Sequence, residues 1–489
     1  MSQQPLPPPS ALNLDNIQGD ILSGLPKKTQ TYFFFQITDA RLFRSQLVEF
    51  TPLVKTVAQV IKDRKAIDDH KRKGDKTLIT MVGVNIAFSH KGFAFMGIDD
   101  ANLTKTETIF EMGQKKDAQS LGDKGTTVGS EFVPDWEPEF LQDIHGVILV
   151  SGDSHGTVNK KLQQVKEIFG LAQGPNKSSI KAVTSIVGDV RPGKESGHEH
   201  FGFLDGISNP SVIGFDKDPN PGPKPVPAGV LVTGHEGDPV ATRPAWAVDG
   251  SFLTFRYLFQ NVPEFDKFLK DHPVPLPGLT PEEGSELLGA RFVGRWKSGT
   301  PIDISPFRDD PELAADPKSE EGFCHRNNNF RFQAEGSFQK ICPFAAHVRK
   351  TLPRADLEDL PPNGISIQKN RIARRGVQFG PEVTKEEKLT GKTIHGRGLL
   401  FACYSTSIVN GFAFLQKSWA NNPTFPPESA TEVPGLDPLI GQGQRKLSGT
   451  DPNNPSFELT LPDFVVPRGG EYFFSPSLKG LRETLAVAA

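Results

Sequence analysis

The sequence predicts an α+β protein of two related domains, because one strand-helix pattern occurs twice in its 489 residues. In the first copy, the apolar residues 31–37 form a predicted buried strand, and residues 39–50 follow with helical spacing. In the second copy, residues 251–257 and 263–271 repeat this pattern, and Pro263 suits a helix start. The length of the chain also favours two domains, since one hydrophobic core rarely organises so long a chain.

A later segment of each half strengthens the repeat. Residues 78–95 and residues 399–414 both end in the sequence Gly-Phe-Ala-Phe. Antiparallel β-sheets with peripheral helices, as in the ferredoxin-like β-α-β-β-α-β motif, are compatible with both halves. The Pro-rich residues 215–225 are unsuited to a helix or a central strand. We therefore expect two ferredoxin-like domains, at residues 1–235 and 236–489.

Charge and hydropathy exclude two classes of partner. The 55 basic and 58 acidic residues give a net charge of -3, which provides no positive field for nucleic acid or anionic lipid. The longest apolar runs, such as residues 399–403, are far shorter than the roughly 20 residues that span a bilayer. Residues 1–10 lack the basic and apolar regions of a signal peptide.

The composition is poor in side chains that are easily oxidised. There are 36 Phe but only 4 Tyr, 4 Trp, 4 Met and 3 Cys. Such a core suits a protein that handles a strong oxidant, although compositional drift explains the counts equally well. Cys324, Cys342 and Cys403 have no CxxC spacing, so we expect buried free thiols rather than a disulfide framework or a thiolate metal site.

Two segments contain candidate site residues. His347 follows small and apolar residues and precedes Arg349, Lys350 and Arg354. This arrangement is compatible with an imidazole facing a flat apolar ligand with carboxylates at its edge, and haem has that form. A surface or capping histidine is the alternative.

The second segment is Gly-Phe-Leu-Asp-Gly at residues 202–206. Gly202 and Gly206 permit a tight turn and close approach of the backbone to a planar ligand, with Asp205 as a carboxylate between them. An ordinary Asp-Gly turn is the alternative reading.

These motifs together resemble fungal dye-decolorizing peroxidases. Residues 202–206 match the family's GxxDG signature, and the His347 segment is similar to its proximal-histidine segment. Further matches in the family's order are residues 17–22, 294–299 and 398–401. The resemblance implies two ferredoxin-like domains, with haem b held mainly by the C-terminal one.

The resemblance also implies roles for individual residues. His347 would be the axial ligand of the haem iron and Asp437 the acceptor that orients it, with Gly202, Gly206 and Arg354 as further cofactor-binding residues. Asp205 and Arg374 would form the distal catalytic pair, with Arg375 as the alternative arginine. Trp419 resembles a surface radical site, and its polar neighbours suggest solvent contact.

The implied activity is reduction of hydrogen peroxide coupled to oxidation of bulky aromatic substrates, such as anthraquinone dyes and phenolic or lignin-related compounds. A non-catalytic haem-binding or haem-delivery protein is the alternative. The resemblance implies an extracellular protein, with a cytoplasmic one as the alternative, and a monomer or weak dimer. We identify no carboxylate cluster that would support manganese oxidation.

Overall fold

The computed structural model describes residues 12–487 except 76, 172–173, 175–176, 218, 220, 316–325, 334–337 and 428–432. The predictions for residues 1–10 and for Cys324 lie outside this set. Cys403 is a buried free thiol, as expected, and Cys342 is also buried. Within the described residues no helix is both long and apolar enough to cross a membrane.

The N-terminal half forms a four-stranded antiparallel sheet with helices on one face. Along the chain come β1 (Thr29–Ile37), α2 (Ala40–Phe50), α3 (Val57–Arg72), β2 (Val82–Phe88), β5 (Gly146–Gly152), α8 (His155–Ile168) and β6 (Ile180–Asp189). The strand order β6-β1-β5-β2 is that of a ferredoxin-like sheet. Asp39 caps α2 by accepting a hydrogen bond from the Leu42 backbone N–H.

The C-terminal half repeats this topology. Its elements are β7 (Ser251–Gln260), α9 (Val262–Asp271), α10 (Pro281–Val293), β8 (Ala373–Arg374), β9 (Val377–Phe379), β10 (Gly398–Ser405) and β13 (Val465–Ser475). The order is β13-β7-β10, and β8 and β9 both pair with the far edge of β10. The expected fold class and both predicted strand-helix pairs are therefore confirmed.

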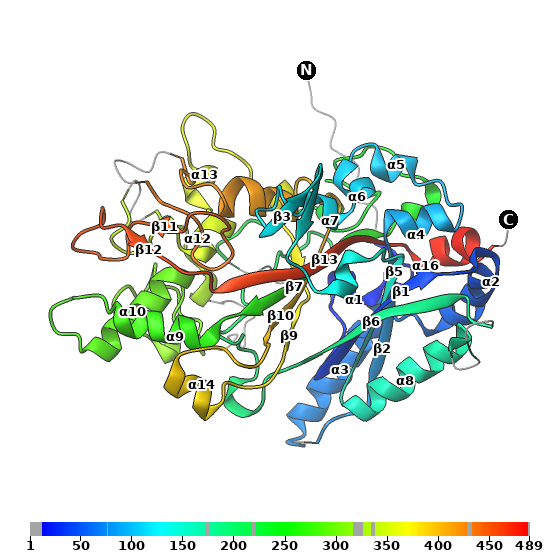
Figure 1. The fold of residues 1–489 in the computed structure, drawn as a ribbon, viewed down its shortest axis with the longest axis horizontal. Helices are drawn as coiled ribbons and strands as arrows, with labels where there is room; N and C mark the ends of the chain where they lie inside the picture. The colour runs from blue at the N-terminus through cyan, green and yellow to red at the C-terminus, as the bar shows by residue number, and fades with distance from the viewer. Residues whose placement is uncertain are drawn as a thin grey trace.

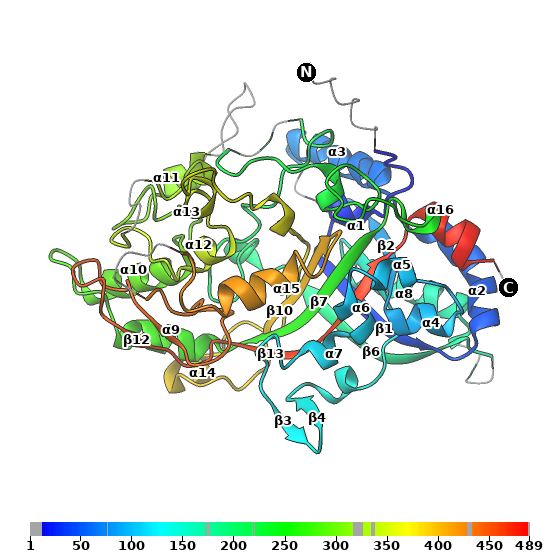
Figure 2. The ribbon, with the colours of Figure 1, turned by 90° about the horizontal axis from the view of Figure 1, so that it is seen from above.

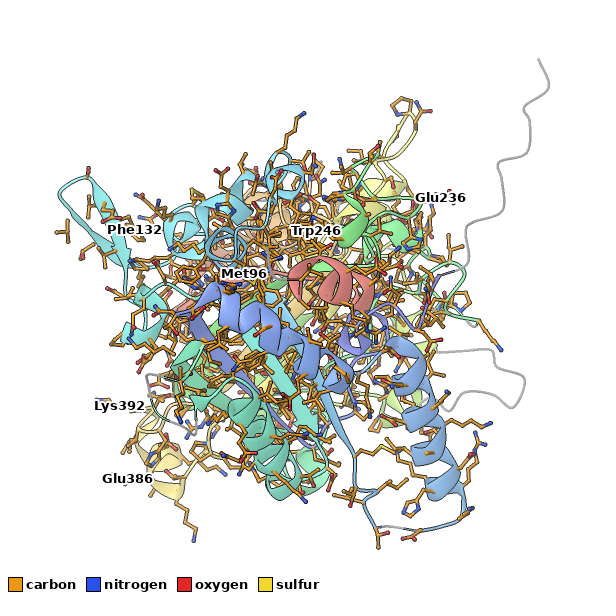
Figure 3. All side chains as sticks on the ribbon, turned by 90° about the vertical axis from the view of Figure 1, so that its right-hand side faces the viewer. Met96, Phe132, Glu236, Trp246, Glu386 and Lys392 are labelled. Carbon is orange, nitrogen blue, oxygen red and sulfur yellow. The ribbon has the colours of Figure 1, made fainter. Side chains whose placement is uncertain are left out.

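Shorter elements connect these strands and helices. They are α1 (Gly19–Leu22), α4 (His90–Phe95), α5 (Ala101–Thr104), α6 (Thr108–Met112), α7 (Gln114–Asp117), β3 (Gly125–Val128), β4 (Glu131–Pro134), α11 (Pro311–Ala314), α12 (His347–Thr351), α13 (Ala355–Glu358), α14 (Lys385–Thr390), α15 (Phe412–Phe414), a π-helix (Leu415–Ala420), β11 (Lys446–Leu447), β12 (Leu459–Thr460), α16 (Leu478–Gly480) and a second π-helix (Leu481–Leu485). Figure 3 shows the hairpin of β3 and β4, which carries Phe132, projecting from the body of the molecule.

The two half-sheets join into one barrel-like structure. Phe474 of β13 pairs with Phe88 of β2, so a continuous sheet runs through both halves, and β7 and β13 cross the centre of the molecule (Figure 2). The opposite edges also meet, because a Cβ placed on Gly188 of β6 would lie 2.4 Å from Val377 Cγ1 of β9. The domain boundary at residue 235 falls in the long connection between β6 and β7 and stays a prediction.

Alternating side chains divide the core between the inside and the outside of this barrel. In β1, Phe33 and Phe35 belong to the cluster under the helices, whereas Tyr32 and Phe34 point to the interior. There the Phe255 ring of β7 lies 4.9 Å from that of Tyr32 and 5.0 Å from that of Phe34, between ring centroids. Helices α2 and α8 flank the N-terminal half and α9 and α10 the C-terminal half (Figure 1).

Candidate active site

A cavity of about 260 Å³ lies in the C-terminal half and extends to the long connection between β6 and β7. Strands β7 and β10, helices α10 and α12 and the first π-helix contribute to its wall. Much of the wall is apolar, including Phe203, Leu258, Phe401, Leu415 and Ile440. Asp205, Arg374 and His347 line the same cavity, so the structure brings together the three residues expected to surround the iron.

Asp205 reaches the cavity from an irregular loop fixed by backbone hydrogen bonds. Its N–H donates to Gly197 O at 3.0 Å, and the Leu204 N–H donates to Lys297 O at 3.1 Å. Gly206 has a φ of +84°, a conformation that favours glycine, and its N–H donates to Asp205 Oδ1 at 2.6 Å. Gly202 also has a positive φ, but it lies beside Lys297 and is not part of the cavity wall.

Arg374 ends β8 and forms an ion pair with Asp205 through Nη1 and Oδ1. Its backbone N–H donates to Asn209 Oδ1 at 2.9 Å, which ties the strand to the Asp205 segment. Arg375 points elsewhere and donates to the carbonyl oxygens of α1, including Asp20 O at 2.8 Å from Nε. Of the two candidate arginines, only Arg374 reaches the cavity.

The ion pair between Asp205 and Arg374 shifts the pKa of each side chain in the direction that keeps it charged. Burial acts to raise the pKa of Asp205, but the Arg374 guanidinium and the Gly206 N–H outweigh it, so this pKa lies below its ordinary value. The carboxylate in turn raises the pKa of Arg374 against the opposing effect of burial. Both side chains remain about one-third exposed, at 34% and 33%, so the ion pair is accessible from the cavity.

His347 begins α12, and Asp437 holds its imidazole ring. The distance between His347 Nδ1 and Asp437 Oδ2 is 2.8 Å. The fully buried Asp437 is itself fixed through Oδ1, which accepts hydrogen bonds from the N–H groups of Leu439 at 2.8 Å and Ile440 at 3.0 Å. Burial acts to lower the pKa of His347, but the Asp437 charge and hydrogen bond raise it above the ordinary value. With Nδ1 engaged, Nε2 is the nitrogen free to bind a metal.

Besides Arg374, the cavity wall contains two further cations that the sequence analysis missed. Arg295 and Arg371 line the cavity and are almost fully buried, and burial lowers their pKa to about 9 and about 10. No carboxylate among the described residues forms an ion pair with either guanidinium. Arg295 donates hydrogen bonds to Gly299 O, Asn327 O and Asn328 Oδ1, but these neutral acceptors leave its charge uncompensated. Buried cations without a carboxylate partner in a ligand cavity suit an anionic ligand group. Arg295 lies in a motif quoted above, but nothing in the sequence indicated this role.

Arg354, in contrast, lies behind the cavity wall. Its guanidinium stacks 3.7 Å from the Phe330 ring centroid and donates to Asn328 Oδ1 at 2.8 Å. Arg295 donates to the same oxygen at 2.9 Å, so this asparagine links Arg354 to the cavity wall. Arg349 and Lys350 also bind protein groups, namely Asp356 and Asn422 O. The run of cations after His347 therefore does not form the edge of the cavity.

Trp419 lies on the π-helix whose residues Leu415 and Gln416 line the cavity. The expected solvent contact is wrong, because Trp419 is only 5% exposed. Its ring stacks on Phe425 at a centroid distance of 5.0 Å and meets Phe414 edge-on at 5.3 Å. The polar neighbour Lys417 points inward as well, since its Nζ donates to the buried Asp117 at 2.6 Å.

The fold and the cavity define a class: a two-part α+β barrel whose cavity is lined by a carboxylate-bound histidine and an aspartate–arginine ion pair. Residues 16–192 match a family model described as the DyP dimeric alpha+beta barrel domain. The chain is 43% identical to a dye-decolorizing peroxidase from Auricularia auricula-judae and 42% identical to one from Mycena epipterygia, covering 98% of this chain and 88% of each relative.

Solved structures agree over the whole fold. A variant of the dye-decolorizing peroxidase from Pleurotus ostreatus superposes with a TM-score of 0.92 at 54% identity, and an ancestral D-type enzyme with 0.90 at 60%. Each comparison covers 98% of this chain and 100% of the other. The chain belongs to the dye-decolorizing peroxidase family, and it is an oxidoreductase acting on peroxide with the haem dependence of that family.

Proposed function

We propose that the protein binds haem b in the described cavity, with His347 Nε2 as the axial ligand of the iron. The Asp437 carboxylate would hold the imidazole in the tautomer that leaves Nε2 free and would increase its basicity. Arg295 and Arg371 would receive the propionates, since both are buried cations in the wall of the cavity. The apolar side chains of the wall suit the porphyrin face.

Asp205 and Arg374 would activate peroxide. Haem, when bound, supplies the iron that is oxidised by peroxide and later reduced by an aromatic substrate. Asp205, kept ionised by its lowered pKa, takes the proton of one peroxide oxygen and delivers it to the other, which leaves as water. The Arg374 guanidinium stabilises the negative charge that develops on the leaving oxygen.

One observation supports this assignment most strongly: the Asp205–Arg374 ion pair and His347 line a single cavity. Haem storage or delivery would require the histidine that holds the iron but neither a proton carrier nor a cation paired with it. We therefore favour catalysis over the non-catalytic alternative. We also propose that the substrates are bulky aromatic compounds and that Trp419 is an oxidisable relay for their electrons. We further propose that the protein is extracellular and is a monomer or weak dimer.

Loading the purified protein with haem and adding peroxide with an anthraquinone dye tests this function. We expect a five-coordinate ferric spectrum and peroxide-dependent bleaching. His347→Ala should retain haem poorly and bleach no dye, because no other identified side chain supplies the axial nitrogen. A normal five-coordinate spectrum of His347→Ala without added imidazole would refute the ligand assignment, and absence of bleaching by the wild type would refute the activity.

A further inference from the structure

Tyr472 on β13 lies close to the cavity but outside its wall. It is fully buried, and the centroid of its ring is 6.4 Å from that of Phe412, which does line the cavity. The cavity-lining Arg256 lies 6.0 Å from the same Phe412 ring, between the guanidinium carbon and the ring centroid. The Phe412 ring therefore neighbours both the Tyr472 ring and the cavity.

The Tyr472 hydroxyl has a fixed base as its hydrogen-bond partner. It donates to Asp117 Oδ2 at 2.7 Å, and Asp117 is 1% exposed. The other oxygen, Oδ1, accepts hydrogen bonds from Lys417 Nζ at 2.6 Å and from Ser120 Oγ. These contacts hold Oδ2 towards the phenol. Burial, with the nearby Asp117 charge, raises the pKa of Tyr472 well above its ordinary value, so the phenol keeps its proton until it is oxidised.

Tyr32 provides a contrast within the same chain. It is also fully buried, and its ring also packs against aromatic side chains, including Phe255. Among the described residues, however, its hydroxyl has no hydrogen-bond partner. Oxidation of a buried phenol produces a strongly acidic proton that must move to a base, and a buried charge without a partner is costly. Tyr472 meets this requirement and Tyr32 does not.

We propose that Tyr472 is an internal oxidisable residue that stores one oxidising equivalent of the peroxidase. In this step Tyr472 gives one electron to the peroxide-oxidised enzyme and its hydroxyl proton to Asp117 Oδ2. The products are a neutral phenoxyl radical, a protonated Asp117 and an enzyme reduced by one electron. Because Tyr472 is buried, the radical has no contact with a bulky dye, so it serves when reducing substrate is scarce. The proposal rests on the peroxidase function above.

Freeze-quench electron paramagnetic resonance of the haem-loaded protein, mixed with peroxide in the absence of reducing substrate, tests this step. Ring-deuterated tyrosine identifies tyrosyl signals by their narrowing. We expect a tyrosyl signal in the wild type and in the matched control Tyr32→Phe, and loss of that signal in Tyr472→Phe. Phenylalanine retains the packing of Tyr472 and removes only the hydroxyl.

Asp117→Asn is the second variant, because an amide keeps the size of the carboxylate but does not take up the proton. It should also lose the tyrosyl signal, and it tests the proposal if Tyr472→Phe folds poorly. A tyrosyl signal that persists in either variant would overturn the inference about Tyr472 but not the proposed function. The same holds for a wild type that reacts with peroxide and forms no tyrosyl radical. A protein that binds no haem or does not react with peroxide would overturn the proposed function, and with it the source of oxidant.

Discussion

Arg374 and Arg375 are adjacent in the chain, but only one of them reaches the cavity. Successive side chains of an extended strand point to opposite faces, so a pair of arginines at the end of β8 must diverge. Arg374 meets Asp205, whereas Arg375 binds carbonyl oxygens of α1. The sequence predicted that one arginine would pair with Asp205, but the choice depends on which face of β8 the cavity occupies, and that is a property of the tertiary fold.

Arg374→Leu should slow the reaction with peroxide by roughly a hundredfold to a thousandfold, because losing a preorganised charge at a developing anion costs about 2.7 to 4 kcal/mol. It should also shift the pH profile. In the wild type the guanidinium keeps the pKa of Asp205 below its ordinary value, so the carboxylate stays a base in acid. Without Arg374 this lowering effect is lost, so the pKa of Asp205 should rise and the acid limb of the pH profile should move to higher pH.

Stopped-flow mixing with peroxide across the acid range measures both effects of Arg374→Leu. Arg374→Lys is the matched control, since it retains a cation near Asp205 and should shift the acid limb less. If Arg374→Leu reacted with peroxide at the wild-type rate and kept the acid limb of its pH profile at the same pH, Arg374 would not belong to the proposed distal pair.

Trp419→Phe tests the proposed relay at a residue whose burial was predicted incorrectly. Sequence neighbours such as Lys417 and Asn421 indicated solvent, but both bind groups of the N-terminal half. Unlike the fully buried Tyr472, Trp419 keeps 5% of its surface exposed, and its ring stacks on Phe425, so it suits electron transfer from a bulky dye that does not enter the cavity. We expect turnover of such dyes to fall sharply and the peroxide reaction to stay normal. Steady-state assays with a bulky dye and with a small phenol distinguish loss of the relay from loss of the peroxide reaction. Equal dye turnover by the wild type and by Trp419→Phe would contradict the relay.

At the scale of elements, α14 depends on one buried carboxylate. Glu387 forms a capping box with Thr384 and also accepts two hydrogen bonds, at 2.8 and 2.7 Å, from the Arg397 guanidinium that precedes β10. Both side chains of this ion pair are fully buried. The capping pattern is visible in the sequence, but the partner lies ten residues further on, so only the structure shows the ion pair that anchors this helix.

Glu387→Gln should lower the free energy of unfolding by about 3 to 5 kcal/mol, because it leaves the Arg397 charge buried and unpaired. Burial acts to raise the pKa of Glu387, but backbone N–H groups and Arg397 hold it far below the ordinary value of 4.5. The stabilisation is therefore present above that ordinary value and is lost as the pH falls towards the folded-state pKa. Thermal unfolding at neutral pH measures the difference, with the exposed Glu386→Gln as control. Equal melting temperatures of the two variants would contradict this account.

At the scale of the whole molecule, the sequence predicted the strands and helices of each half better than the way in which the two halves join. The Phe-rich strands and helical spacings predicted β1, α2, β7 and α9, because local periodicity determines these elements. The pairing of Phe88 with Phe474 joins residues far apart in the chain, and no local pattern specifies it. The same holds for the candidate site, where the motifs indicated Asp205 and His347, whereas Arg295 and Arg371 emerge only when the barrel is assembled.

Closure of the barrel at β6 and β9 depends on Gly188. A Cβ at this position would lie 2.4 Å from Val377 Cγ1 and 2.7 Å from the Gln378 backbone oxygen. The second of these atoms is backbone and moves only with the strand. Because β9 begins three residues after Arg374, displacement of β9 should also disturb the ion pair with Asp205.

Gly188→Ala should therefore destabilise the fold by about 1 to 3 kcal/mol, the usual cost of inserting a methyl group into a packed core, and it should slow the peroxide reaction as well. Gly156→Ala is the matched control, since Gly156 lies in α8, its Cβ would meet only Ser154 Oγ at 4.0 Å, and alanine favours a helix. Melting temperature and stopped-flow rate are measured for both variants. A Gly188→Ala protein as stable as Gly156→Ala would show that β6 and β9 separate at little cost. If only its stability fell, barrel closure would not be coupled to the position of Arg374.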